Sequence, residues 1–169
     1  MSNLASDHLY TLHRTPFALA PVIQSFYDEW ESQEKDILLS YLILPLVTYK
    51  PMQSFLHLAK RSSSVRTMTS DTGRLLGLAL RVQEFKPITN AALLILTAEK
   101  SLEITPEMSV LSINKLRSEN ADKNLLRYSK KLAMVFSDES AVSIFFFFKQ
   151  KTAYEVRNCD WSSDVCSSD

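Results

Sequence analysis

Residues that bind metals or transfer protons are few in this sequence, and their spacing does not favour a site. The histidines are His8, His13 and His57, and no two of them have the His-x-x-x-His spacing that places two rings on one side of a helix. Cys159 and Cys166 have no histidine near them, so the pair lacks the four ligands of a structural zinc site. We therefore predict no metal site and no cofactor.

Candidates for nucleophilic catalysis are equally weak. Ser62, Ser63 and Ser64 form a cluster without a neighbouring glycine, whereas a nucleophilic serine needs a strained turn and a base beside it. The only glycines are Gly73 and Gly77, which excludes the glycine-rich loops that surround nucleotide phosphates. We expect the serine cluster to be a loop, and we expect no catalytic residue and no enzymatic activity.

The charged residues gather in two short segments. Four carboxylates lie close together without a histidine or cysteine, so we expect them to face solvent: Asp28, Glu29, Glu31 and Glu34. Four cations follow one another further along the chain and could contact phosphate, although simple solvation is the favoured explanation: Lys60, Arg61, Arg66 and Arg74.

The total charge argues against a protein that mainly grips nucleic acid. The chain has 19 Lys and Arg against 19 Asp and Glu, whereas such proteins usually carry a strong basic excess. Nucleic acid is a possible partner on this basis, but another protein is the favoured one.

The last residues resemble the translation of a short-read sequencing adapter. Residues 149–155 read KQKTAYE and residues 160–169 read DWSSDVCSSD, with an unrelated tetrapeptide between them, which matches the two adapter arms around a variable index. One departure is Val156, where the adapter bases favour Ile or Met. The four phenylalanines at 145–148 are explained most simply by a homopolymer DNA tract. We therefore expect residues 145–169 to be a non-native tail that is disordered and packs poorly.

Residues 1–144 are then expected to form one helical domain. Their length suits a single core, and 46% of the whole chain is apolar, as in ordinary globular proteins. The longest apolar stretch, residues 37–47, is interrupted by Ser40 and is shorter than the roughly 20 residues that span a bilayer. Residues 1–13 lack the charged start and apolar run of a secretory signal. These features predict a cytoplasmic protein without membrane contact.

Helical spacing and cap residues predict the first half of the fold. Thr15 before Pro16 is a helix start, and apolar residues at helical spacing extend this helix over 16–32. Asp36 is expected to cap a second, central helix that runs to residue 47 and bends at Pro45. A short helix follows from Pro51, and the stretch rich in serine and threonine at 61–72 is predicted to be a loop.

The second half is predicted from the same signals. Asp71 is expected to cap the next helix, and Pro87 to start another that ends near residue 99. Residues 102–104 and 109–111 alternate around a turn and predict a β-hairpin, and a last helix covers 119–136. The fold class is therefore mainly α, a compact helical domain with a short hairpin, which is compatible with a winged-helix-like core.

Three segments together resemble a known family. They are TPFAL from residue 15, ILLSYLILPLVTYKP from residue 37, and RLLGLALRVQEFKPITNAALLILTAEKSLEI from residue 74. Residues 15–144 resemble the middle component of three-component ABC systems, and NLLRYSKKLAMVFSDESAVSI from residue 124 resembles the helix near its end. The resemblance implies a bacterial conflict or defence operon. In such an operon an ABC-type ATPase and an effector protein do the chemistry, and this component would bridge or regulate them.

Two other classes of function have weaker support. A winged-helix regulator of DNA needs a basic recognition helix, and residues 87–99 offer mainly Thr89 and Asn90 as polar contacts. A small enzyme needs titratable groups that converge in a pocket, and the sequence contains no such set. The family's motif supplies no catalytic residue either.

Overall fold

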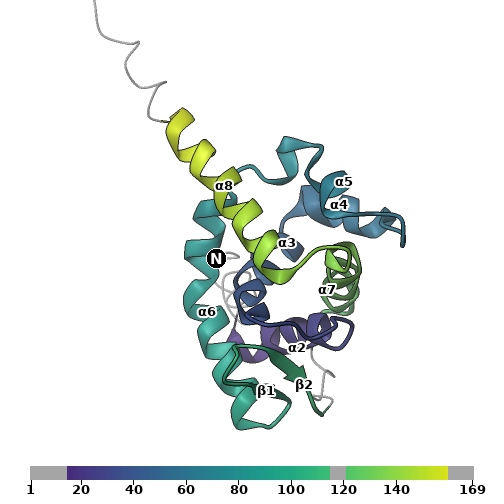
Figure 1. The fold of residues 1–169 in the computed structure, drawn as a ribbon, viewed down its shortest axis with the longest axis vertical. Helices are drawn as coiled ribbons and strands as arrows, with labels where there is room; N and C mark the ends of the chain where they lie inside the picture. Colours follow the sequence, from purple (N-terminus) through teal and green to yellow (C-terminus); the bar gives the residue numbers. More distant parts are fainter. Residues whose placement is uncertain (1–14, 115–120, 160–169) are drawn as a thin grey trace, which may run out of the picture.

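Helices build most of the part of the chain that the structure describes, with one short hairpin among them, as predicted (Figure 1). The structure, a computed structural model, describes residues 15–114 and 121–159, with side chains for 15–114 and 121–151. The elements in chain order are α2 (Pro16–Tyr27), η1 (Asp36–Leu39), α3 (Ser40–Val47), α4 (Lys50–Leu58), α5 (Val65–Thr69), η2 (Thr72–Arg74), α6 (Leu78–Ala98), β1 (Leu102–Ile104), β2 (Val110–Ser112), α7 (Lys123–Phe136) and α8 (Ala141–Cys159).

Helix α3 is the centre of the core. It packs against α2, α4, α6 and α7, and α2 in turn lies against α6 and α7. Every residue from Leu42 to Val47 is buried, so the prediction of a central, apolar helix is confirmed. Burial on all sides is what a helix without a polar face requires.

The start of α2 is as predicted, but its end is not. The Thr15 hydroxyl accepts a hydrogen bond from the N–H of Ala18, and Pro16 occupies the first turn. The helix ends at Tyr27 rather than at residue 32. The chain leaves the helix there, and Trp30 returns to the core, because its indole N–H donates to the carboxylate of Asp36.

The prediction that Asp36 caps the second helix is wrong. The segment begins as a 3₁₀ turn, η1, and the Asp36 side chain makes no capping hydrogen bond to it. The carboxylate points backwards instead and accepts a bond from the N–H of Gln33. The Asp36 carboxylate therefore bonds to donors outside the helix and not, as the sequence pattern predicts, to the helix's own N–H groups.

Helix α6 is one continuous helix of 21 residues, so the predicted helix start at Pro87 is wrong. Gly77, with φ of 66°, supplies the left-handed turn from which α6 begins. Pro87 cannot donate a hydrogen bond to the carbonyl of Gln83. Both residues are exposed, so water can satisfy that carbonyl and the helix continues through the proline.

The predicted loop at 61–72 contains a short helix, α5. Ser64 and Thr67 form a capping box, in which each side chain accepts from the backbone N–H of the other. Met68 and Val65 are buried beneath it. The serine and threonine content that we interpreted as a loop thus belongs partly to helix caps.

The hairpin is confirmed, with a strand pairing of Leu102 to Ser112 and Ile104 to Val110. Its connecting turn is fastened to the start of η1, where the N–H of Lys35 donates to the carbonyl of Glu107. The hairpin therefore packs against the segment that follows α2 and is not an isolated wing.

The last predicted helix is present as α7, capped by Asp122, whose carboxylate accepts from the N–H of Asn124. Residue 119, where we had placed its start, lies outside the described residues. A further helix, α8, follows from Ala141. The side chain of Phe148 is 1% exposed and packs against Phe136, with ring centroids 6.0 Å apart. The expectation that the segment after residue 144 packs poorly is therefore wrong at Phe148, whereas residues 160–169 lie outside the described part.

Candidate functional site

The structure places His57, the one histidine among the described residues, at the contact between α4 and α7. Its Nδ1 lies 3.2 Å from a guanidinium nitrogen of Arg127, and its carbonyl accepts a hydrogen bond from Lys131. His8, His13 and Cys166 lie outside the described residues. Within the described ranges, no three His, Cys, Asp or Glu residues are grouped as metal ligands.

The serine cluster has structural roles. The Ser63 hydroxyl accepts from the backbone N–H of Lys60, and Ser64 caps α5. Ser62 is exposed. These bonds close the turn between α4 and α5, which is the loop function that the sequence predicts for this cluster.

Asp36 is the most heavily bonded buried acid in the described part of the chain. Its carboxylate accepts three hydrogen bonds, from the indole of Trp30 at 3.1 Å, from the N–H of Gln33 at 2.8 Å and from the N–H of Val110 at 2.7 Å. Burial raises the pKa of Asp36, and these hydrogen bonds oppose the increase. Because all three partners are structural donors, the site fastens segments together and is not arranged to transfer a proton.

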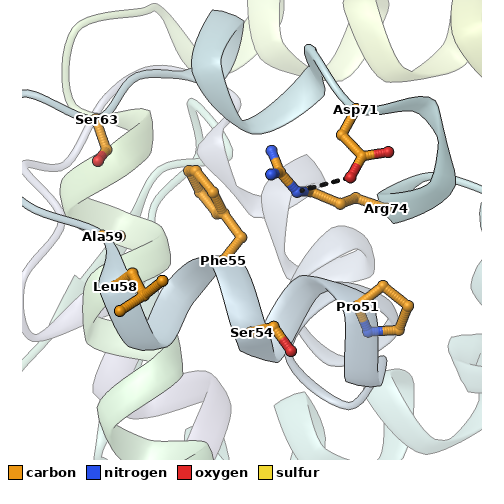
Figure 2. A pocket seen from close by; sticks show the side chains of 8 residues that line it. All are labelled: Pro51, Ser54, Phe55, Leu58, Ala59, Ser63, Asp71 and Arg74. Carbon is orange, nitrogen blue, oxygen red and sulfur yellow. Dashed lines mark ion pairs between the residues drawn. The ribbon is translucent and has the colours of Figure 1, made fainter.

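Two shallow hollows flank α4. The first, of about 400 Å³, lies towards α5 and η2 (Figure 2). In it the Arg74 guanidinium stands 4.7 Å from the centre of the Phe55 ring and 3.6 Å from the carboxylate of Asp71. Arg74 also donates to two backbone carbonyls, so it holds the turn after α5 in place.

The second hollow, of about 500 Å³, lies on the other side of α4, towards α7. Lys50, His57 and Tyr128 line it, and it shares Leu58 with the first hollow. Leu58 stands between the two hollows with 75% of its surface exposed. Ser54 and His57 both line the second hollow, but the Ser54 hydroxyl donates to the carbonyl of Lys50, and Nδ1 of His57 lies against Arg127. The serine is therefore not hydrogen-bonded to a base, as a catalytic nucleophile would be.

Cations dominate the elements around these hollows. We call the surface of residues 50–74 and 121–136 the cationic face. These two segments contain nine Lys and Arg but only two acids, Asp71 and Asp122, and one of the nine, Lys130, pairs with Glu29 outside them. The nine are Lys50, Lys60, Arg61, Arg66, Arg74, Lys123, Arg127, Lys130 and Lys131. The balanced charge of the whole chain hides this local excess, and the basic segment at 60–74 was the signal in the sequence that pointed to it.

The predicted acidic group lies elsewhere, on the loop after α2. Its four carboxylates are exposed, which confirms that they face solvent. Glu29 pairs with Lys130 at 3.1 Å, and the hydroxyl of Ser112 in β2 donates to Asp28. The hairpin carries two further exposed acids, Glu103 and Glu107.

Exposed apolar side chains occur mainly on other elements. Leu80 and Leu94 on α6 are 66% and 70% exposed. They are 14 residues apart, about four helical turns, and so lie along one side of the helix. Leu76, in the turn before the helix begins, is also exposed. We call these three leucines the leucine row.

The two polar residues of the supposed recognition helix lie in different surroundings. Thr89 on α6 is fully buried, and Asn90 accepts a hydrogen bond from the hydroxyl of Tyr41 at 2.9 Å. Thr89 therefore cannot reach base edges, and the exposed Asn90 uses its amide oxygen for the bond to Tyr41.

A comparison with protein families now adds to this geometry. The model of the family described as ABC-three component (ABC-3C) system Middle Component 3 matches residues 4–151. The chain belongs to this family. No curated protein and no solved structure gives a significant match to it.

Membership confirms the resemblance found in the sequence and extends it at both ends, from 15–144 to 4–151. A middle component is one part of a three-component system, so the other components of that system are its partners. No helix in the described part of this Middle Component 3 protein is long and apolar enough to cross a membrane.

Proposed function

We propose that this middle component is a non-enzymatic bridge that links the ABC-type ATPase of its system to the effector protein, in a bacterial conflict or defence operon. The observation that carries the proposal is the family match over residues 4–151. The proposal places the protein in the cytoplasm, where such an ATPase has access to its nucleotide.

The leucine row is the surface that we assign to the ATPase. Stable protein interfaces bury roughly 800 Å² on each partner and have apolar centres that exclude water. Leu80 and Leu94 span about 21 Å of α6, which suits a surface of that size. Their exposure costs free energy in the isolated protein, and a partner that covers them recovers it.

Co-purification with the ABC ATPase encoded in the same operon tests the proposal. The chain should form a complex at micromolar concentrations, and it should hydrolyse no nucleotide by itself. The double variant Leu80→Glu with Leu94→Glu should lose the complex because it places two charges in an apolar interface.

Leu58→Glu is the matched control, since Leu58 is at least as exposed but lies on α4. It should leave the complex intact. A wild-type chain that fails to bind the ATPase would contradict the bridge. A complex that survives the α6 variant but not the control would move the interface to α4.

A further inference from the structure

The cationic face carries more positive charge than its own acids can neutralise. Of its two acids, Asp71 pairs with Arg74, and Asp122 caps α7. Five exposed cations make no ion pair within the described residues, and they come from three different parts of the face: Lys50, Lys60, Arg61, Arg66 and Lys123. Unpaired surface charge adds little to the stability of a folded protein, so attraction of an anionic partner is the simplest role for these cations.

The packing of α4 against α7 makes these cations one surface. Lys123, Arg127 and Lys131 recur at intervals of four, so they lie along one side of α7. Arg127 and Lys131 both contact His57 of α4. Lys50 lines the same hollow as His57, and α5 and η2 continue the surface on the other side of α4.

The composition of this face suits phosphate better than it suits a protein partner. The exposed hydroxyl of Ser62 lies next to Arg61, and such donors commonly contact phosphate oxygens, whereas the hydroxyls of Ser54 and Thr67 already donate to backbone carbonyls. Leu58 is the only large, strongly exposed apolar side chain described on this face. The apolar surface that a protein interface needs lies instead on α6 and the hairpin.

We propose that the cationic face, centred on α4 and α5, binds the phosphate backbone of nucleic acid. Contact is made to the backbone and not to base edges, so binding is independent of sequence. This inference goes beyond the bridging role, because it assigns a second ligand to a second surface. The leucine row binds the ATPase, and the cationic face binds nucleic acid. The neutral total charge does not oppose it, because the cationic face itself contains only two acids and the other carboxylates lie on other segments.

Fluorescence anisotropy with the full chain and a labelled DNA duplex of random sequence, together with its single strand, tests the proposal. Binding should weaken steeply with salt, with a slope of log K against log salt of about −0.9 for each duplex phosphate contacted. The double variant Arg61→Glu with Arg66→Glu should weaken binding at least about tenfold and reduce that slope by about one unit for each residue.

The double variant Lys86→Glu with Lys100→Glu is the matched control. It has the same change in net charge, and both lysines are exposed on or just after α6, away from the cationic face. It should keep wild-type affinity within about twofold, because exposed charges beyond a Debye length of about 10 Å are screened. Circular dichroism should show that both double variants remain folded.

Three results would overturn the proposal. Absence of binding to both DNA probes at low salt is the first, and an equal loss of affinity in the two double variants is the second. The third is that the wild type does not bind DNA and the double variant at Arg61 and Arg66 loses the ATPase complex. That result would assign the cationic face to an acidic surface of a protein partner. DNA binding is measured without the ATPase, so its outcome is separate from the test of the bridge.

Discussion

The Asp36 carboxylate accepts a hydrogen bond from the backbone N–H of Val110 at 2.7 Å, and so joins residues that are 74 positions apart. The same carboxylate holds Trp30 and Gln33 after the end of α2. One buried side chain therefore ties the hairpin, the loop after α2 and the start of the central segment together.

Replacing Asp36 by Ala should destabilise the protein strongly. The substitution leaves three donors without their acceptor, and each orphaned buried group costs about 1–3 kcal/mol, so we expect a loss of at least about 3 kcal/mol in the free energy of unfolding. Urea unfolding followed by circular dichroism measures it. Glu31→Ala, an exposed acid on the same loop, should change stability by less than about 0.5 kcal/mol. Equal effects of the two substitutions would refute the role of Asp36.

The raised pKa of Asp36 also predicts a dependence on pH. A carboxyl whose pKa is higher in the folded state stabilises the protein fully below its ordinary pKa, near 3.8, and this contribution is lost as the pH rises through the raised value. The stability of the wild type relative to Asp36→Asn should therefore fall from pH 3 upwards and level off above the folded pKa. Unfolding curves of both proteins across this range measure the difference, and a difference that stays flat or rises would contradict the shift.

Leu42→Ala should cost about 2–5 kcal/mol, as do large-to-small changes in well-packed cores. Leu42 is buried in α3, the helix that the other helices surround. Thermal and urea unfolding both report the change. A loss below about 1 kcal/mol would mean that the core closes around the missing methyl groups.

Two phenylalanines in α8 allow a matched comparison of packing. Phe148→Ala should cost about 3–5 kcal/mol because its ring is buried against Phe136, whereas Phe146→Ala, at a position 55% exposed, should cost less than about 1 kcal/mol. Differential scanning calorimetry of the two variants provides the measurement. Similar melting temperatures would show that α8 does not pack as described.

The origin of residues 145–169 is a separate question. We propose that these residues are encoded by adapter DNA, and sequencing of the genomic locus should then reveal no KQKTAYE after residue 148. An intact genomic reading frame that encodes this string would refute the proposal. Burial of Phe148 does not decide the matter, because any large apolar side chain at that position fills the same space.

Local signals predicted the elements whose ends are set locally. Thr15 with Pro16 starts α2, and alternation around a turn gives the hairpin, because caps and turns depend on neighbouring residues. Pro87 and Asp36 were misjudged for the opposite reason. Pro87 lies on a solvent-exposed side of α6, where water can satisfy the carbonyl that the proline leaves unbonded. The Asp36 carboxylate accepts hydrogen bonds from residues as distant as Val110. Neither fact can be predicted from a short window of sequence.

The candidate surfaces were only partly predictable. The basic segment at 60–74 was visible in the sequence, but its continuation onto α7 depends on the packing of Arg127 and Lys131 against His57. The leucine row could not be separated from core leucines, because α6 presents apolar residues on most of its sides and its hydrophobic pattern has no clear polar face.

The separation of charge gives this protein a property that its total charge conceals. Cations surround α4 and α5, in the upper right of Figure 1, whereas exposed carboxylates occur on the loop after α2 and on the hairpin, which lies at the bottom of the view. A molecule whose balanced charges are separated has an electric dipole. The field of a nearby polyanion therefore orients the molecule more strongly than it attracts it. The molecule would therefore meet a charged partner in one preferred orientation, and this steering would fade once salt shortens the Debye length to a few ångströms.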